Sequence, residues 1–151
     1  MLEWLAGHEY YCFLDGYSGY NQIPIALEDQ EKTMFMCPFG TFAYHWMPFG
    51  LCNTLAIFQC FMLSLFSDMV KRILEIFMDD FSIYGDSFDQ LSSQSRSFPR
   101  AMCQKNLTLN WEKCHFMVQY GIVQGHEISK KEIEVDKVKI EVIAKLSHQN
   151  V

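Results

Sequence analysis

Two adjacent carboxylates interrupt an apolar stretch near the middle of the chain. Asp79 and Asp80 lie between the apolar runs Leu74–Met78 and Phe81–Tyr84. This pattern predicts a β-hairpin in which the two aspartates form a two-residue loop. Aspartate is common in turns for reasons of backbone geometry alone, so a structural role is one interpretation. Like charges this close repel, however, and partly buried carboxylates need a compensating partner such as a cation.

A third carboxylate ends another predicted strand. The segment Tyr10–Leu14 is short, aromatic and apolar, and Asp15 follows it directly. If this strand neighbours the hairpin in one sheet, Asp15, Asp79 and Asp80 converge at one edge. Mg²⁺ prefers oxygen ligands of this kind, and two such ions about 3.5–4 Å apart can support phosphoryl transfer. Spacing alone leaves the convergence open, because Asp15 and the Asp79–Asp80 pair are far apart in the chain.

The remaining elements must position these carboxylates, and they alternate between strands and helices. Residues 86–106 are rich in Ser and Gln, and Pro99 is expected to interrupt any helix there. The mixture predicts an α+β fold with an antiparallel sheet and helices on one face. The other predicted elements are a tight turn over Asp15–Asn21, a hairpin of 33–37 and 41–47 around Pro38–Gly40, a helix from Leu55 to Ile73 with Asn53 or Thr54 as its N-cap, strands over 113–118 and 122–128 with Gly121 at the turn, and a helix over Asp136–Leu146.

Composition narrows the classes of protein. The 151 residues are 50% hydrophobic and 20% charged, which excludes general disorder, and no apolar run approaches the length of a membrane span. The net charge of −6 argues against a simple electrostatic nucleic-acid binder but not against a metal-dependent site. Six cysteines without a C-x-x-C pair indicate free thiols in a reducing compartment. The first ten residues carry acid rather than base, so we expect an intracellular protein without signal or transit peptide, and an organelle-encoded origin also fits.

Four ordered motifs make this sequence resemble reverse transcriptases. Phe13–Ile23 is similar to motif A, Met47–Asn53 to motif B, and Phe77–Asp80 to motif C of that family. Leu109–Asn110 with Lys113, Cys114 and Phe116, followed by Gly125–His126, is similar to the region leading into the primer grip. The motif sequences are most similar to those of gypsy-class LTR retrotransposons, plant elements in particular, and the resemblance covers residues 2–146.

The resemblance implies an RNA-directed DNA polymerase that adds dNTPs to a primer 3′-hydroxyl on an RNA or DNA template. It further implies two Mg²⁺ ions, with Mn²⁺ as an alternative, a polymerase palm fold with part of the fingers, and no membrane partner. Taken alone, Tyr20 could equally be a core tyrosine and His126 a surface histidine. The implied site residues, in the order metal, nucleotide and template or primer, are Asp15, Asp79 and Asp80; Tyr20, Phe49 and Gly50; and Gln59, Gly125 and His126.

The chain also departs from the family pattern. Residues 1–146 are expected to form a partial domain and 147–151 a truncated tail, with the rest of the fingers, the thumb and the RNase H part supplied by a parent polyprotein. Leu55 and Gln124 stand where the family usually has Pro and Leu. The composition of residues 91–104 differs from the family pattern, whereas the segments on both sides match it. Two compensating frameshifts would leave such a stretch. The alternative function is therefore a catalytically inactive remnant of a retroelement.

Overall fold

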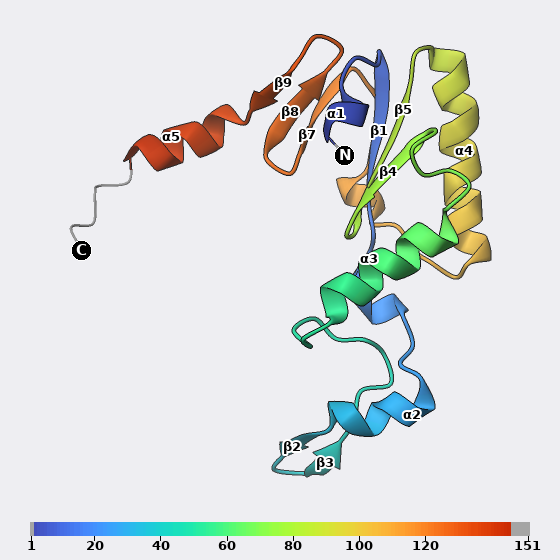
Figure 1. Ribbon diagram of the computed structural model, residues 1–151, viewed down its shortest axis with the longest axis vertical. Helices are drawn as coiled ribbons and strands as arrows, with labels where there is room; N and C mark the ends of the chain where they lie inside the picture. Colours follow the sequence, from blue (N-terminus) through green and yellow to red (C-terminus); the bar gives the residue numbers. More distant parts are fainter. Residues whose placement is uncertain (1, 146–151) are drawn as a thin grey trace.

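A four-stranded antiparallel sheet forms the centre of the computed structural model, which describes residues 2–145 (Figure 1). The predicted strand ending at Asp15 is confirmed, and it occupies an inner position of the sheet. Successive side chains of a strand point to opposite faces, so Cys12 and Leu14 share one face while Tyr11 and Phe13 share the other. In spatial order the strands are β4 (Leu74–Phe77), β5 (Asp80–Gly85), β1 (Tyr10–Asp15) and β6 (His115–Val118).

Two helices cover the first face, as Figure 1 shows, and they complete the main core. Helix α3 (Thr54–Leu65) follows Asn53 as predicted, but it ends eight residues before Ile73, so the expected last two turns are not helical. Helix α4 (Phe88–Gln104) runs along β5, β1 and β6. The fully buried side chains of this core include Cys12, Phe58, Leu74, Ile83, Leu91 and Phe98.

Helix α4 contradicts the expectation that Pro99 interrupts any helix in this segment. The helix continues through Pro99, although proline removes a main-chain donor and crowds the preceding turn. Its apolar residues Leu91, Phe98 and Met102 lie on one side and are almost completely buried against the sheet. At its start, the Ser87 hydroxyl accepts a hydrogen bond from the Gln90 amide at 3.3 Å. Tertiary burial and this N-cap therefore outweigh the unfavourable proline.

The opposite face of the main sheet carries a smaller core. It is covered by the one-turn helix α1 (Leu2–Leu5) and by a second antiparallel sheet of β7 (Tyr120–Val123), β8 (His126–Ser129) and β9 (Ile133–Val135). The predicted strand over 122–128 is divided into β7 and β8 by a turn at Gln124 and Gly125, where Val123 pairs with His126. Both turn residues have positive φ angles of 52° and 76°, as the tightest hairpin turns require. Gly121, expected at the turn before that strand, instead lies within β7.

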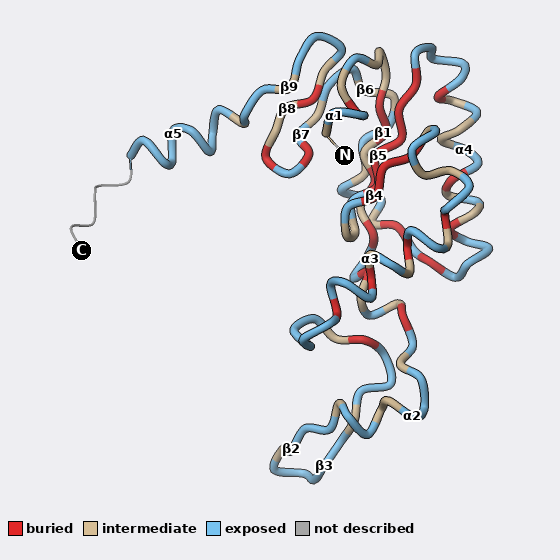
Figure 2. The backbone as a smooth tube through the Cα atoms, viewed as in Figure 1, coloured by how far each residue is buried: buried red, intermediate tan, exposed pale blue. Residues whose placement is uncertain are grey.

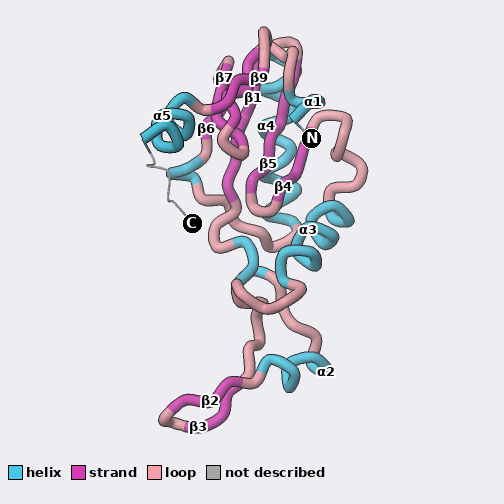
Figure 3. The backbone as a smooth tube through the Cα atoms, turned by 60° about the vertical axis from the view of Figure 1, so that its left-hand side comes forward, coloured by secondary structure: helices cyan, strands magenta, loops and turns pink. Residues whose placement is uncertain are grey.

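Residues 24–46, here called the arm, extend away from the sheets (Figures 1 and 3). The predicted hairpin is confirmed, but its strands β2 (Phe35–Cys37) and β3 (Gly40–Phe42) are shorter than expected. Figure 2 shows that the arm is exposed along most of its length, whereas the main sheet is buried. The arm also contains α2 (Leu27–Gln30) and the 3₁₀ turn η2 (Glu31–Thr33).

The remaining elements are short or lie at the periphery. Gly19–Gln22 (η1) is a 3₁₀ turn that overlaps the predicted Asp15–Asn21 turn and extends one residue beyond it. Trp111–Lys113 (η3) is another 3₁₀ turn, so Lys113 does not begin a strand as expected. Helix α5 (Lys137–Lys145) projects away from the sheets in Figure 1; its predicted end at Leu146 and the predicted tail 147–151 lie outside the described residues. Within residues 2–145, no helix is long and apolar enough to cross a membrane.

Candidate nucleotidyl-transfer site

Asp15 and Asp80 are direct cross-strand partners in the main sheet. Strand β1 pairs antiparallel with β5, and the register places Asp15 opposite Asp80 and Phe13 opposite Ser82. Directly opposite residues in such a pair point to the same face, with Cβ atoms about 4.5–5.5 Å apart. The predicted convergence of these two carboxylates is therefore confirmed.

Asp79 lies at the tip of the hairpin, but Asp80 does not share the loop with it, contrary to the prediction. The two-residue loop consists of Met78 and Asp79, because Phe77 pairs with Asp80 and Asp80 already belongs to β5. Met78 has a φ angle of 55°, a left-handed conformation that is uncommon for a residue with a side chain. This backbone bend places the two aspartates in different environments.

Two glycines allow the turn after β1 to approach the hairpin tip. The Gly16 amide donates a hydrogen bond to the Asp79 carbonyl oxygen at 2.8 Å, which joins the two aspartate-bearing turns directly. At Gly19, a Cβ atom would lie 2.9 Å from the Phe58 ring and 3.4 Å from the Asp79 Cβ atom. A larger residue at position 19 would therefore push α3 or Asp79 out of place.

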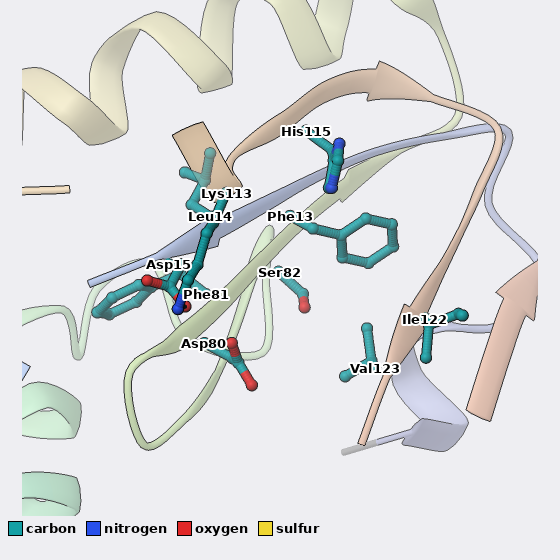
Figure 4. A pocket seen from close by; sticks show the side chains of 10 residues that line it. All are labelled: Phe13, Leu14, Asp15, Asp80, Phe81, Ser82, Lys113, His115, Ile122 and Val123. Carbon is teal, nitrogen blue, oxygen red and sulfur yellow. Dashed lines mark ion pairs between the residues drawn. The ribbon is translucent and has the colours of Figure 1, made fainter. Parts of the chain in front are cut away.

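The carboxylates shape the local electrostatics. Burial raises the pKa of Asp80, and the negative charges of Asp79 and Asp15 raise it further, while the Lys113 ammonium opposes them. Lys113 Nζ lies 3.6 Å from Asp15 Oδ2, and Figure 4 shows its side chain reaching the Asp15 carboxylate. The described residues contain no group of three His, Cys, Asp or Glu side chains gathered closely enough to hold a metal ion by themselves. Two carboxylates with substrate phosphates are nevertheless a usual ligand set for Mg²⁺.

A cavity of about 210 Å³ lies over this carboxylate pair. Its floor includes Phe13 and Ser82 from the main sheet, and its opposite wall includes Ile122 and Val123 from β7 (Figure 4). The cavity thus separates the carboxylates from the second sheet. A larger cavity of about 590 Å³ lies where the arm meets α3, but its acid, Asp29, is paired with Lys32 at 2.6 Å.

Of the predicted nucleotide-binding residues, Tyr20 lies near Asp79 and Phe49 contacts Tyr20. Tyr20 contacts Phe58 and Phe49, with ring centroids 4.6 and 5.7 Å apart. Burial raises the pKa of the Tyr20 hydroxyl, and the Asp79 charge raises it further. Gly50 has a φ angle of 101°, and nothing lies within 4 Å of where its Cβ would be. Tyr20 and Phe49 therefore form an aromatic wall on the Asp79 side of the site.

The predicted template and primer residues fall into two places. Gln59 on α3 is bonded to the hairpin: its Nε2 donates to the Ile76 carbonyl at 3.0 Å, and its Oε1 accepts from the Met78 amide at 2.8 Å. Gly125 lies in the β7–β8 turn and His126 is the first residue of β8, where it pairs with the cavity-lining Val123. The sequence-based prediction of site residues missed Lys113 and Ser82. The motif that Lys113 forms with Cys114 was a signal for Lys113, whereas no local pattern marked Ser82.

Comparison with known proteins identifies relatives across most of the chain. Residues 2–141 match the family of reverse transcriptases (RNA-dependent DNA polymerases). The Pol polyprotein of the Drosophila melanogaster transposon opus is 27% identical over 142 residues, which cover 94% of this chain and 14% of that protein. The corresponding polyprotein of transposon gypsy is 27% identical, with 89% and 13% covered. The transposon Tf2-3 polyprotein of Schizosaccharomyces pombe is 28% identical, with 87% and 10% covered.

Solved structures share the fold. The foamy viral protease-reverse transcriptase in complex with an RNA/DNA hybrid superposes with a TM-score of 0.85 at 15% sequence identity, covering 97% of this chain and 20% of that one. The same viral protein with double-stranded DNA gives a TM-score of 0.79, with 93% and 29% covered. This chain therefore spans a small part of each relative, and that part contains the sheet with both aspartate-bearing turns.

Proposed function

Because this chain belongs to the family of reverse transcriptases (RNA-dependent DNA polymerases), we propose that it carries the site where a primer 3′-hydroxyl attacks the α-phosphate of a dNTP, releasing pyrophosphate. The template would be RNA or DNA. The chain spans only 10–14% of the curated relatives' length, so further parts of a polyprotein would complete the grip on primer, template and triphosphate.

The pairing of Asp15 with Asp80, joined to Asp79 through the Gly16 amide, is the observation that carries this proposal. It brings three carboxylates from distant parts of the sequence to one end of the sheet, beside a cavity. Nucleotidyl transfer needs such a constellation, because positioning and charge stabilisation supply most of the catalysis. A merely structural turn would not require Asp15 and Asp80 to be cross-strand partners beside Asp79.

The donor set fits hard divalent cations. Asp15 and Asp79 would be the principal ligands of two Mg²⁺ ions, or of Mn²⁺ as an alternative, with Asp80 in support. When bound, such ions stabilise the attacking and leaving oxygens of the displacement. Lys113, whose Nζ lies 3.6 Å from Asp15 Oδ2, balances part of the carboxylate charge in their absence.

The other side chains would orient the substrates. The Tyr20 ring, fixed between Phe58 and Phe49, would pack beneath the incoming sugar and exclude a 2′-hydroxyl, which favours dNTP over rNTP. Phe49 and Gly50 would form the nucleotide wall, and Gln59 would lie near the template. Gly125 and His126 would place the primer 3′-hydroxyl across the cavity. No further partner class is needed for the reaction.

A second candidate is an inactive retroelement remnant, and the exposed arm favours it. Met36 and Phe39 are 84% and 91% exposed, and exposed apolar side chains of this kind favour non-productive association. A chain that leaves such residues uncovered can keep the site geometry and still lack productive substrate binding.

Primer extension by the purified 151-residue chain tests both candidates. The assay supplies poly(rA) template, oligo(dT) primer, dTTP and Mg²⁺, beside the variant Asp79→Asn/Asp80→Asn. Asp68→Asn is the matched control, because Asp68 is exposed and lies in the loop after α3, away from the site. We expect the double substitution to lower extension by about a hundredfold or more, since carboxylate charge at the reacting centre is lost, and the control to match the wild type.

The outcomes separate the candidates. Extension that survives Asp79→Asn/Asp80→Asn would contradict the proposed site. A folded wild-type chain that binds Mn²⁺ at these aspartates but extends nothing would show an assembled site that needs the rest of a polyprotein. A folded chain that neither binds Mn²⁺ nor extends the primer is the result that the remnant predicts.

A further inference from the structure

Two glutamine side chains hydrogen-bond main-chain groups in the same manner, one at the Asp79 hairpin and one at the segment beside the Asp15 turn. Gln59 donates to the Ile76 carbonyl at 3.0 Å and accepts from the Met78 amide at 2.8 Å. Gln22 donates to the Thr108 carbonyl at 3.0 Å and accepts from the Thr108 amide at 2.6 Å. Each side-chain amide therefore uses a donor and an acceptor on backbone groups, as the edge of a neighbouring strand would.

Gln59 satisfies the backbone where the hairpin is most strained. Strand β4 is at the edge of the main sheet, so its outward amide and carbonyl groups have no strand partner. Met78, the first residue of the turn, has a φ angle of 55°, which a non-glycine residue keeps only when its surroundings fix it. The Gln59 amide holds the residues on both sides of Phe77 and so fixes the entry to Asp79.

Gln22 acts on the turn that follows Asp15. Its Nε2 also donates to the Tyr17 carbonyl, so the side chain joins the beginning and end of this turn to Thr108. The same segments are joined by the Tyr17 amide to the Thr108 carbonyl at 3.0 Å and by the Asn110 amide to the Asp15 carbonyl at 2.8 Å. Gln22 therefore fastens the Asp15 turn to the chain leading into β6.

We propose that Gln59 and Gln22 are positioning residues that hold Asp79 and Asp15 at their mutual distance by clamping the two turns. The Gly16 amide, bonded to the Asp79 carbonyl at 2.8 Å, connects the clamped segments. Neither glutamine needs to touch a substrate for this role. The inference rests on the proposed function in one respect, namely that the distance between Asp15 and Asp79 matters because the two residues bind metal ions.

Amide hydrogen exchange and Mn²⁺ binding by the full chain test the clamp without requiring polymerisation. In Gln59→Leu, we expect amide exchange at Met78, Asp79 and Asp80 to accelerate about tenfold, because the hydrogen bond from the Met78 amide to Gln59 is lost. The dissociation constant for Mn²⁺ should rise about tenfold, as for other residues that orient metal ligands. Gln22→Leu should weaken Mn²⁺ binding similarly while accelerating exchange at Thr108 instead.

Two matched variants isolate the mechanism. Gln30→Leu removes a comparable bond, from Nε2 to the Ile25 carbonyl at 3.0 Å, but in the arm; it should leave both measurements at the wild-type value. Met78→Gly added to Gln59→Leu should restore most of the Mn²⁺ affinity, because glycine adopts positive φ without strain. If Gln59→Leu does not fold by circular dichroism, Gln59→Glu replaces it in the exchange measurement, since it keeps only the acceptor.

Each result decides the proposal. Unchanged exchange at Asp79 and Asp80 in Gln59→Leu would overturn it, as would Mn²⁺ binding equal to that of Gln30→Leu. If the wild type binds no Mn²⁺ and extends no primer, the proposed function fails, and exchange at the two turns alone decides whether the glutamines clamp them.

Discussion

The main sheet and the arm both contain large apolar side chains, but the burial of these side chains is opposite. In the sheet, Leu14, Phe81 and Ile83 are at most 2% exposed, whereas Met36 and Phe39 in the arm are 84% and 91% exposed. The sheet is covered by α3 and α4 on one face and by the second sheet on the other (Figure 1). Within residues 2–145, no element covers the arm hairpin in this way. Apolar residues thus become a core only where a second layer exists to cover them.

The largest contrast is expected for an aromatic residue between helix and sheet. Phe98 is fully buried, with ring centroids 5.0 Å from Phe66 and 5.3 Å from Phe81. Phe98→Ala should lower the free energy of unfolding by about 3–5 kcal/mol, because it leaves a cavity. The arm variant Leu27→Ala, at a residue 84% exposed, should change it by less than about 0.5 kcal/mol. Urea unfolding measures both, and equal effects would remove the distinction between the two regions.

A smaller loss is expected where the two sheets meet. A Cβ atom at Gly121 would lie 2.2 Å from the Phe13 ring, so Gly121→Ala should lower the free energy of unfolding by about 1–3 kcal/mol. At Gly85, the added Cβ would lie at an ordinary 3.5 Å from the Leu91 Cβ, so Gly85→Ala is the matched control. Thermal unfolding of both variants compares them; a Gly85→Ala loss as large as that of Gly121→Ala would contradict this contact as the cause.

The buried face of the sheet should also give a pH-dependent stability. Glu75 is 6% exposed, its Oε1 has no hydrogen-bond partner, and burial raises its pKa. The folded state then binds the proton more tightly than the unfolded state. Stability from this group is therefore greatest below the unfolded pKa of about 4.3 and is lost as the pH rises through the higher folded pKa. Glu75→Gln should raise the melting temperature near neutral pH.

Melting curves at pH 5 and pH 8 measure this effect. The wild type should lose more stability between the two values than Glu75→Gln does. Glu112→Gln serves as the control, because Glu112 is exposed on η3. A wild type and Glu75→Gln with the same pH dependence would mean that Glu75 does not pay a burial penalty as a carboxylate.

The smallest effect on stability is expected in the arm hairpin. Met36→Ser/Phe39→Ser should change the free energy of unfolding by less than about 0.5 kcal/mol, because both side chains already contact solvent. The same change should reduce self-association, since it removes exposed apolar surface. Light scattering against concentration and urea unfolding are the measurements; a large loss of stability would show that the arm has a core of its own.

Local patterns in the sequence predicted the strand ending at Asp15 and the hairpin around Asp79, because both are apolar runs bounded by polar residues. The register of the hairpin was wrong by one residue. A methionine gives no local sign of the positive φ that this two-residue turn requires at its first position. The Gln59 side chain, which bonds the Met78 amide, comes from another element. Similarly, Gly121 was interpreted as a turn residue. In the structure, the absence of a side chain at Gly121 allows the Phe13 ring to approach its backbone closely.

Long-range features of the site could be predicted only through family resemblance. The spacing of Asp15 and Asp80 did not establish that they pair, and nothing in the residues near Lys113 indicated its ion pair with Asp15. In helix α4 a local signal was misleading. Pro99 predicts a break in the helix, but the burial of Phe98 against the sheet stabilises it. Side-chain contacts between distant segments thus decided what local propensity could not.

The inner position of β1 has a consequence for the synthesis of this protein. Its neighbours in the sheet are β5 and β6, and Tyr10 pairs with Gly85 while Tyr11 pairs with Val118. A ribosome adding about 5–20 residues per second needs several seconds to pass from β1 to the end of β5. During that time the nascent chain exposes an apolar strand with two unpaired edges. Chaperone demand should therefore be highest between the synthesis of β1 and that of β5, before the two aspartate-bearing turns can come together.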